Sequence, residues 1–251
     1  MSEFFLELFS EEIPANLQST ARENLLNNFK NLFDKKNISY HKDIKVYSTP
    51  NRLLISFKNL SKEVIQHAEE IRGPNINAQE VAIEGFIRSN NIEKKNVYKK
   101  KIDKGEFYFF KKQAIKINTK DILCDEIPVL LGKITWKKSM RWGDHNLYWG
   151  RPLKSILAIF DGKILNFKFH HIQSTNFTFI DKDFEEKIKI FKSFEKYMYY
   201  FKTLKIIIDN EKRKNFIKSE LLKLSYKKKL KININQHLLN EVSDLVEKPK
   251  I

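Results

Sequence analysis

Two hydrophobic periodicities near the N-terminus constrain the fold of this chain most strongly. From Leu17 to Leu32, apolar residues recur every three or four positions, which is typical of the buried stripe of an amphipathic helix. The apolar residues Leu53, Ile55 and Phe57 occupy alternate positions, as in a strand with one buried face. The side chains that we expect in the core are Leu17, Leu25, Phe29, Leu53, Ile55 and Phe57.

The segments around these stripes predict a strand, a helix and a strand pair. Residues 2–9 are rich in Phe and partly alternate, which favours a strand. Ser10 is a candidate cap for a helix that runs to about residue 36, with Glu11 and Glu12 near its positive end. Strands are expected at 44–49 and 52–57.

The remaining pattern is also mixed. We expect helices at 78–90 and 120–132, strands at 97–102, 106–112, 153–160 and 164–169, and a break at 69–78 around Gly73-Pro74. Beyond about residue 183, helical spacing predicts helices at 184–201 and 204–223. The prediction is an α+β fold with mixed or antiparallel sheets, packed helices and a helical C-terminal third. The expected domains are 1–180, with a subdivision near 60–80, and 181–251.

Net charge and arginine usage point in two directions. The chain of 251 residues has a net charge of +16, which favours a nucleic-acid partner. The alternative is compositional drift, because the Lys-, Asn- and Ile-rich composition is that of an A+T-rich genome. In a chain that uses lysine for most of its positive charges, an arginine suggests that its position needs the planar guanidinium and its bidentate hydrogen bonds. The arginines are Arg22, Arg52, Arg72, Arg88, Arg141, Arg151 and Arg213.

Several site types lack their sequence signatures. The chain has no phosphate-loop, dinucleotide-binding, HExxH or CxxC motif, and the single Cys124 has no cysteine partner. His170 and His171 are adjacent on an expected strand and would point to opposite faces, so we expect no metal site there. No transmembrane run or signal peptide is evident. We therefore expect no catalytic or metal-binding residue and a cytoplasmic location.

The stretch WKKSMRWGDHNLYWGRPL, residues 136–153, differs from the rest of the chain. It contains all three tryptophans, Trp136, Trp142 and Trp149, and two of the arginines. Trp142 or Trp149 could stack on a base, but tryptophans beside a strand pair also close hydrophobic cores. Arg141 could bind phosphate or pair with Asp144, and both interpretations remain open.

Nine segments of the chain follow one another in the order of a known family. They are LELFSEEIPA (6–15), STPNRLLI (48–55), IRGPN (71–75), AIEGFIRSNNI (82–92), KGEFYFF (104–110), WKKSMRWGD (136–144), RPLKSILAIFDGKIL (151–165), IIIDNEKRK (206–214) and LLNEVSDLVEKP (238–249). KSMRWGD followed by RPxxxxLAxxDGxI is the most specific part. In this set of segments the chain resembles the β subunit of the bacterial heterotetrameric glycyl-tRNA synthetase.

The resemblance implies a function for the chain. It implies an assembly of two α and two β chains, in which the α chain activates glycine with ATP and Mg and the β chain helps to recognise tRNA(Gly). It implies no cofactor bound by this chain and no membrane partner. The residues expected to bind RNA are Arg52, Arg72, Lys138, Arg141 and Arg151.

The sequence departs from the family in places. The segment after IRGPN is short, and Phe177-Thr178-Phe179-Ile180 replaces a GHRF-like sequence. The family's β subunit is also several hundred residues longer, so the chain is expected to be a fragment or a shortened gene product. The alternative functions are a general basic RNA-binding protein and a degraded remnant.

Overall fold

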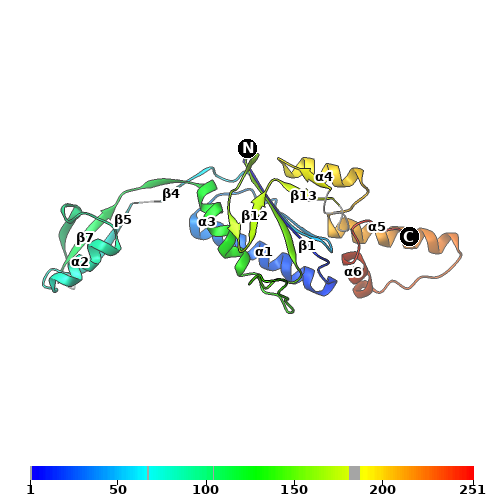
Figure 1. The fold of residues 1–251 in the computed structure, drawn as a ribbon, viewed down its shortest axis with the longest axis horizontal. Coiled ribbons are helices and arrows are strands. Elements are labelled where there is room, and N and C mark those ends of the chain that lie inside the picture. Colours follow the sequence, from blue (N-terminus) through cyan, green and yellow to red (C-terminus); the bar gives the residue numbers. More distant parts are fainter. Residues whose placement is uncertain (1, 67, 104, 181–186) are drawn as a thin grey trace. The chain divides into compact units, whose positions relative to one another are not determined.

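The computed structural model describes residues 2–66, 68–103, 105–180 and 187–251. The fold is α+β with mixed sheets and helices in the C-terminal region, as predicted. The chain divides into two compact units, drawn in Figure 1. The main unit comprises Met1–Lys62 and Thr119–Ile251, and the small unit comprises Glu63–Asn118.

This division differs from the one that we expected from the sequence. Residues 187–251 belong to the same unit as the N-terminal strands, because the C-terminal helices pack on the main sheet. The expected boundary near 180 lies beside residues 181–186, which are outside the described residues. The chain leaves the main unit after Lys62 and returns to it at Thr119, where the Thr119 amide donates to the Lys62 carbonyl at 2.8 Å.

The main sheet has the order β11-β12-β9-β1-β3-β2, with β10 paired to β9. Its strands are β1 (Glu3–Ser10), β2 (Lys45–Ser48), β3 (Arg52–Lys58), β9 (Leu153–Phe160), β10 (Lys163–Ile164), β11 (Lys168–Phe169) and β12 (Ile172–Thr175). β1 is antiparallel to both neighbours, with Leu6 opposite Ile55 and Ala158. β12 is parallel to β9, so the sheet is mixed.

Helices cover both faces of this sheet. On one face, α1 (Ala15–Lys36) packs Phe29 and Phe33 against Phe4 and Phe57. α3 (Thr119–Gly132) packs beside α1. On the other face, α4 (Phe194–Thr203) forms a cluster with Phe5 and other sheet residues. β1 is consequently buried on both faces, which explains its nearly continuous apolar sequence.

The predicted core residues are confirmed. All six expected side chains are buried, namely Leu17, Leu25, Phe29, Leu53, Ile55 and Phe57. The predicted helix cap was wrong. α1 begins at Ala15 after Pro14, without a side-chain cap. Ser10 instead ends β1, where its amide donates to the Asn51 carbonyl at 2.9 Å.

The C-terminal region contains less helix than predicted. Ile188 lies in a short strand, β14 (Ile188–Ile190), which pairs with β13 (Phe177–Phe179). Helix α4 begins only at Phe194, because Ser193 accepts a bond from the Lys196 amide as its cap. The expected Phe184 lies outside the described residues. The chain is then irregular until α5 (Asn210–Lys227), which is followed by α6 (Gln236–Asp244).

The small unit contains two sheets and a helix. β4 (Glu63–Gln66) pairs with β8 (Ile115–Asn118), and β5 (Glu69–Asn75), β7 (Gly105–Lys112) and β6 (Val97–Ile102) form a sheet in the order β5-β7-β6. A 3₁₀ turn (Lys94–Asn96) precedes β6, and α2 (Glu80–Ser89) confirms the helix predicted at 78–90. The predicted break at 69–78 was wrong for residues 69–75, because this edge strand accommodates Pro74 where its register shifts.

Candidate functional site

The tryptophan-rich loop between α3 and β9 is organised around a small aromatic core. Trp149 is buried, and its ring lies 5.1 Å from that of Trp136 and 5.8 Å from that of Phe169. A Cβ atom on Gly150 would lie 2.4 Å from the Trp136 ring. The loop therefore needs glycine at this position, and Trp136 and Trp149 support its shape.

Two of the predicted RNA-binding residues are exposed on this loop. Lys138 and Arg141 both lie at the surface. Arg141 donates from Nη1 to Oδ1 of Asn146 at 3.5 Å, so the structure gives it a different partner from the Asp144 that the sequence suggested. The exposed Tyr148 belongs to the same loop. Cationic and aromatic groups that face solvent in one loop suit contact with an RNA backbone and bases.

A pair of stacked histidines joins the loop to the β11–β12 connection. The rings of His145 and His171 lie 3.5 Å apart and nearly parallel, and Trp142 meets His171 edge-on at 5.9 Å. Burial, and then the nearby His145, lower the pKa of His171. The expected placement of His170 and His171 on a strand was wrong, because both lie in the turn that follows β11.

Arg52 lies in the core rather than at the surface. Its guanidinium is inserted between the rings of Phe9 and Phe201, with centroids at 4.8 and 4.4 Å. It donates to Thr178 Oγ1 at 3.0 Å and to the Phe179 carbonyl at 2.7 Å. Thr178 lies on β13.

Two carboxylates complete the surroundings of Arg52. Glu7 on β1 lies 3.4 Å from Nη1, and Glu247 lies 3.2 Å from Nε. Burial raises the pKa of Glu7, and the charge of Arg52 opposes that rise. Because Arg52 is fully buried among these partners, its contacts support a structural role and leave no face of the guanidinium for RNA.

A second buried arginine, Arg213 on α5, fixes the C-terminal segment. It donates to the carbonyls of Ser243 at 2.5 Å, Ile207 at 2.7 Å and Ser48 at 3.0 Å. Its Nη2 also lies 3.2 Å from Asp244 Oδ1. One guanidinium therefore connects α5, α6 and the end of β2.

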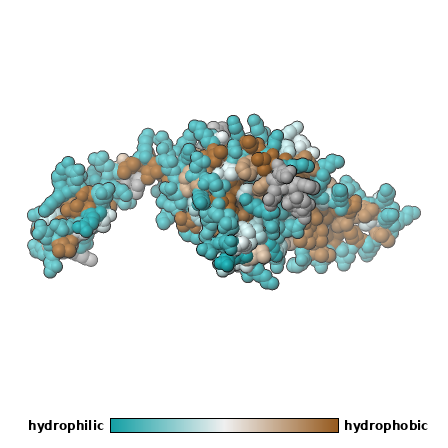
Figure 2. All heavy atoms as spheres, in the orientation of Figure 1, coloured by the Kyte–Doolittle hydropathy of each residue, from teal (hydrophilic) through white to brown (hydrophobic). Residues whose placement is uncertain are grey.

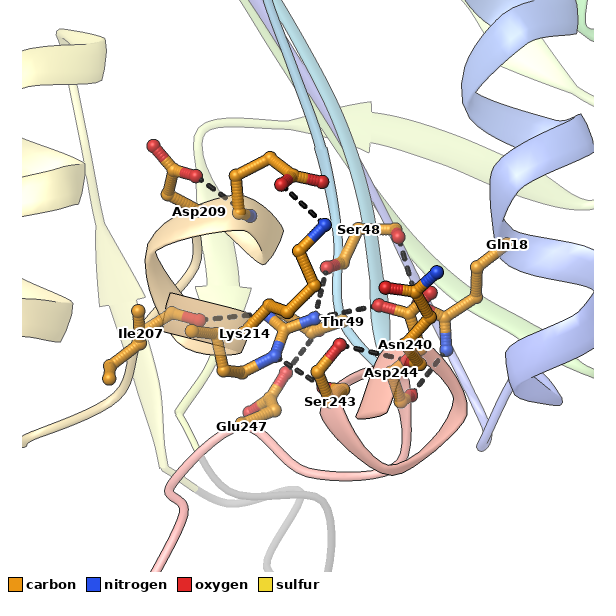
Figure 3. A network of polar contacts seen from close by, with 12 residues as sticks. Gln18, Ser48, Thr49, Ile207, Asp209, Lys214, Asn240, Ser243, Asp244 and Glu247 are labelled. Atoms are coloured by element: carbon orange, nitrogen blue, oxygen red, sulfur yellow. Dashed lines mark hydrogen bonds and ion pairs between the residues drawn. The ribbon is translucent and has the colours of Figure 1, made fainter. Parts of the chain in front are cut away.

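Helix α1 joins the same network. Gln18 donates to the Asp244 carbonyl at 2.6 Å and accepts a bond from Ser48 Oγ at 2.8 Å, as Figure 3 shows. Arg22 lies 3.7 Å from Asp244. Burial raises the pKa of Asp244, while Arg22 and Arg213 lower it. The C-terminal end of α6 is thus held against α1 and β2 by polar contacts.

Two neighbouring grooves lie beside these arginines and share lining residues. One has a volume of about 1170 Å³ and the other of about 680 Å³. Their common lining residues are Glu12, Pro50, Asn51 and Leu245. The smaller groove also contains the half-buried Arg151, which donates to the Gly150 carbonyl at 2.8 Å, and Lys154. Several segments that carry the family resemblance therefore meet at one end of the main sheet.

The C-terminal helices expose apolar side chains next to this region. Figure 2 shows hydrophobic surface over this part of the main unit. The exposed residues there include Phe216, Leu222, Leu224, Tyr226, Leu230, Leu238, Val242 and Leu245. Exposed apolar groups that cluster in this way are typical of a surface that contacts a partner.

Arg72, the remaining predicted RNA-binding residue, belongs to the small unit. It is exposed on β5, and its guanidinium lies 3.6 Å from the centroid of the Phe107 ring. The structure thus brings Lys138 and Arg141 together on one loop and places Arg151 in a groove of the same unit. Arg72 is on a separate unit.

The described residues contain no group of three or more His, Cys, Asp or Glu side chains that could hold a metal ion. Within the same residues, no helix has both the length and the apolar character that a membrane span requires.

Comparison with known proteins identifies the family. A sequence model described as "Glycyl-tRNA synthetase beta subunit" matches residues 4–251. The chain belongs to the glycyl-tRNA synthetase beta subunit family. Proteins named "Glycine--tRNA ligase beta subunit" from Rickettsia canadensis and Rickettsia conorii are each 38% identical to it over 251 residues. The match includes 100% of this chain but only 37% and 38% of those relatives.

Sequence reasoning did not predict the buried polar contacts of two side chains in this region, Arg213 and Glu7. Arg213 had a usable signal, because it is an arginine retained in a lysine-rich chain within the segment IIIDNEKRK. Glu7 is a carboxylate in an otherwise apolar strand, flanked by Leu6 and Leu8. A charge in such a strand indicates a buried partner.

Proposed function

We propose that the chain acts as the β-subunit part of a glycine–tRNA ligase, an aminoacyl-tRNA synthetase of translation. In this proposal it supports the ATP-dependent attachment of glycine to tRNA(Gly) by a catalytic α subunit. The observation that carries the proposal is the family match over residues 4–251. The chain spans 37% to 38% of the first relatives, so the activity proposed is that of the complex.

The partners and cofactors follow from the same proposal. Two α and two β chains form the assembly in the cytoplasm, and ATP with Mg is used through the α subunit. This chain supplies contacts to protein and RNA rather than catalytic groups or a bound cofactor. The exposed apolar side chains of α5 and α6 support a protein contact.

The loop arginines and lysine are the proposed RNA contacts of the main unit. Lys138 and Arg141 are exposed on the same loop, and Arg151 lines the nearby smaller groove. Their charges would bind tRNA phosphates by releasing counterions. Arg52 is not included, because its guanidinium is buried.

Co-expression with the α subunit of the same organism tests the proposal. We expect the two chains to co-purify at salt concentrations that screen non-specific charge contacts. The chain expressed alone and the α subunit expressed with an unrelated lysine-rich protein are the controls. Tight binding of unrelated RNAs without any retention of α would contradict the proposal and would favour a general basic RNA-binding protein.

A further inference from the structure

The three-stranded sheet of the small unit has two different faces. Residues directly opposite each other on antiparallel strands share a face. On one face Val97 lies opposite Phe110, whose ring meets Phe86 of α2 edge-on at 6.2 Å. Helix α2 therefore covers this face, and Gly73 on β5 permits the close approach of Phe86.

The opposite face, which we call the open face, combines cations with aromatic rings. Register places Arg72 and Tyr98 beside Phe109, and Lys100 beside Phe107. Alternation along the strands adds Glu70 and Lys111 to the same face. The open face consists of Glu70, Arg72, Tyr98, Lys100, Phe107, Phe109 and Lys111. No other α-helix of the small unit's described residues is available to cover it.

Contacts on the open face hold its aromatic rings in place. The Tyr98 and Phe109 rings are nearly parallel at 6.4 Å, and the Tyr98 hydroxyl donates to Glu70 at 2.6 Å. Tyr98 still has an exposed fraction of 37%. The Arg72 guanidinium stacks on Phe107 at 3.6 Å. A ring or guanidinium that is fixed before binding loses little conformational freedom when a base stacks on it.

The charges of the open face favour an anion. Lys100 pairs with Glu70, which neutralises both. Lys111 lies opposite Glu70 in the β5–β7 register. Among the residues that the structure describes, however, neither Lys111 nor Arg72 forms an ion pair with a carboxylate. Two exposed cations thus flank the rings. This combination of aromatic platforms and backbone-neutralising cations is how proteins bind single-stranded nucleic acids, whereas a protein-docking face is depleted in lysine.

We propose that the open face of the small unit binds unpaired nucleotides of RNA. In this inference Tyr98 and the Arg72–Phe107 stack receive bases, and Arg72 and Lys111 neutralise phosphates. It rests on the proposed function only for the identity of the RNA, tRNA(Gly). Duplex RNA, whose bases are stacked and inaccessible, should bind less tightly than a single strand of the same charge.

Two charge-matched double variants of the whole chain test this inference. Arg72→Ala with Lys111→Ala removes two cations from the open face. Lys99→Ala with Lys101→Ala removes two cations from the α2-covered face of the same sheet. The probe is an oligouridine of about 12 nucleotides, measured by fluorescence anisotropy at several salt concentrations and compared with duplex RNA. Melting temperatures establish that each variant is folded.

We expect the open-face variant to bind oligouridine at least about tenfold more weakly and to lower the salt slope by about one to two units. The control variant should stay within about threefold of the unchanged chain, because it leaves the proposed phosphate contacts in place. Tyr98→Leu should weaken binding by about tenfold through lost stacking. Tight single-strand binding with these losses would support the inference even if the α subunit did not co-purify.

Equal losses in the two double variants would overturn the inference, as would equal affinity for duplex and single strand. Unchanged RNA affinity with impaired α-subunit retention in the Arg72→Ala and Lys111→Ala variant would also overturn it, because the face would then be a protein contact. Each of these three results would leave the proposed function standing if the unchanged chain still co-purified with α.

Discussion

The guanidinium of Arg213 lies 3.2 Å from the carboxylate of Asp244 and joins α5 to the end of α6. The same group donates to the Ser48 carbonyl at 3.0 Å, so the C-terminal helices are tied to the hairpin β2–β3. The Arg213 side chain itself is enclosed, with an exposed fraction of 0%. These contacts of Arg213 hold α5, α6 and β2 together at the end of the main sheet where the two grooves lie.

Removal of the Arg213 side chain should destabilise the main unit strongly. Arg213→Ala removes a cation from Asp244 and a donor from four carbonyls, so the free energy of unfolding should fall by about 3–5 kcal/mol. Arg213→Lys should also be destabilising, since an ammonium cannot reproduce the planar fork. Lys218→Ala on the exposed side of α5 is the matched control, with a change below about 0.5 kcal/mol. Equal urea midpoints for Arg213→Ala and Lys218→Ala would show that the Arg213 contacts do not stabilise the main unit.

A methyl group at Gly150 should disrupt the tryptophan loop. Gly150→Ala places its Cβ against the Trp136 ring, and such overpacking lowers stability by about 1–3 kcal/mol. The Gly132→Ala variant is the control, because a Cβ there meets no atom within 4 Å. In the Gly150→Ala background, Trp136→Leu should recover part of the loss. No recovery would contradict the assigned clash. Tryptophan fluorescence monitors denaturant unfolding of the unchanged chain, Gly150→Ala and Gly132→Ala. Circular dichroism compares these three proteins with the Gly150→Ala and Trp136→Leu double variant, which has lost one tryptophan.

The stacked pair His145–His171 should make stability depend on pH. Burial and His145 lower the pKa of His171 in the folded state, so the unfolded chain binds a proton at a higher pH than the folded one. The free energy of unfolding should therefore fall as the pH decreases through about 6.5, the ordinary histidine value. It should level off below the folded pKa. His171→Phe should reduce this dependence. Melting curves between neutral and mildly acidic pH measure this dependence, and His237→Phe, at an exposed position, is the control. The same pH dependence of stability in His171→Phe and His237→Phe would contradict the assignment.

Arg52 and Arg141 should give opposite results when each is changed to Ala. Arg141→Ala should weaken tRNA binding and lower its salt slope by about one unit, with an unchanged melting temperature. Arg52→Ala should lower the melting temperature, because Glu7 then remains buried without its cation. A stable Arg52→Ala variant with impaired tRNA binding would reverse the two assignments. Arg141→Lys should retain part of the affinity, since a lysine still neutralises phosphate.

The contrast between these arginines explains what the sequence could and could not predict. The helix at Ala15–Lys36 and the strands around Leu53 were predictable because their periodicity is local. The strand β14 was not, because Ile188 belongs to it through pairing with β13, and its spacing to Phe191 and Phe194 also fits a helix. Arg52 is buried whereas Arg141 is exposed. This difference was not predictable, because burial depends on contacts with residues distant in sequence.

Glycine charging of tRNA(Gly) is the most direct test of the central claim, that this chain works as the β-subunit part of a glycine–tRNA ligase. The measurement compares the α subunit alone, this chain alone and the co-purified pair, with ATP, Mg and radiolabelled glycine. We predict that the pair forms glycyl-tRNA and that this chain alone neither activates glycine nor charges tRNA. Charging by α that is unchanged when this chain is added, or glycine activation by this chain alone, would contradict the account.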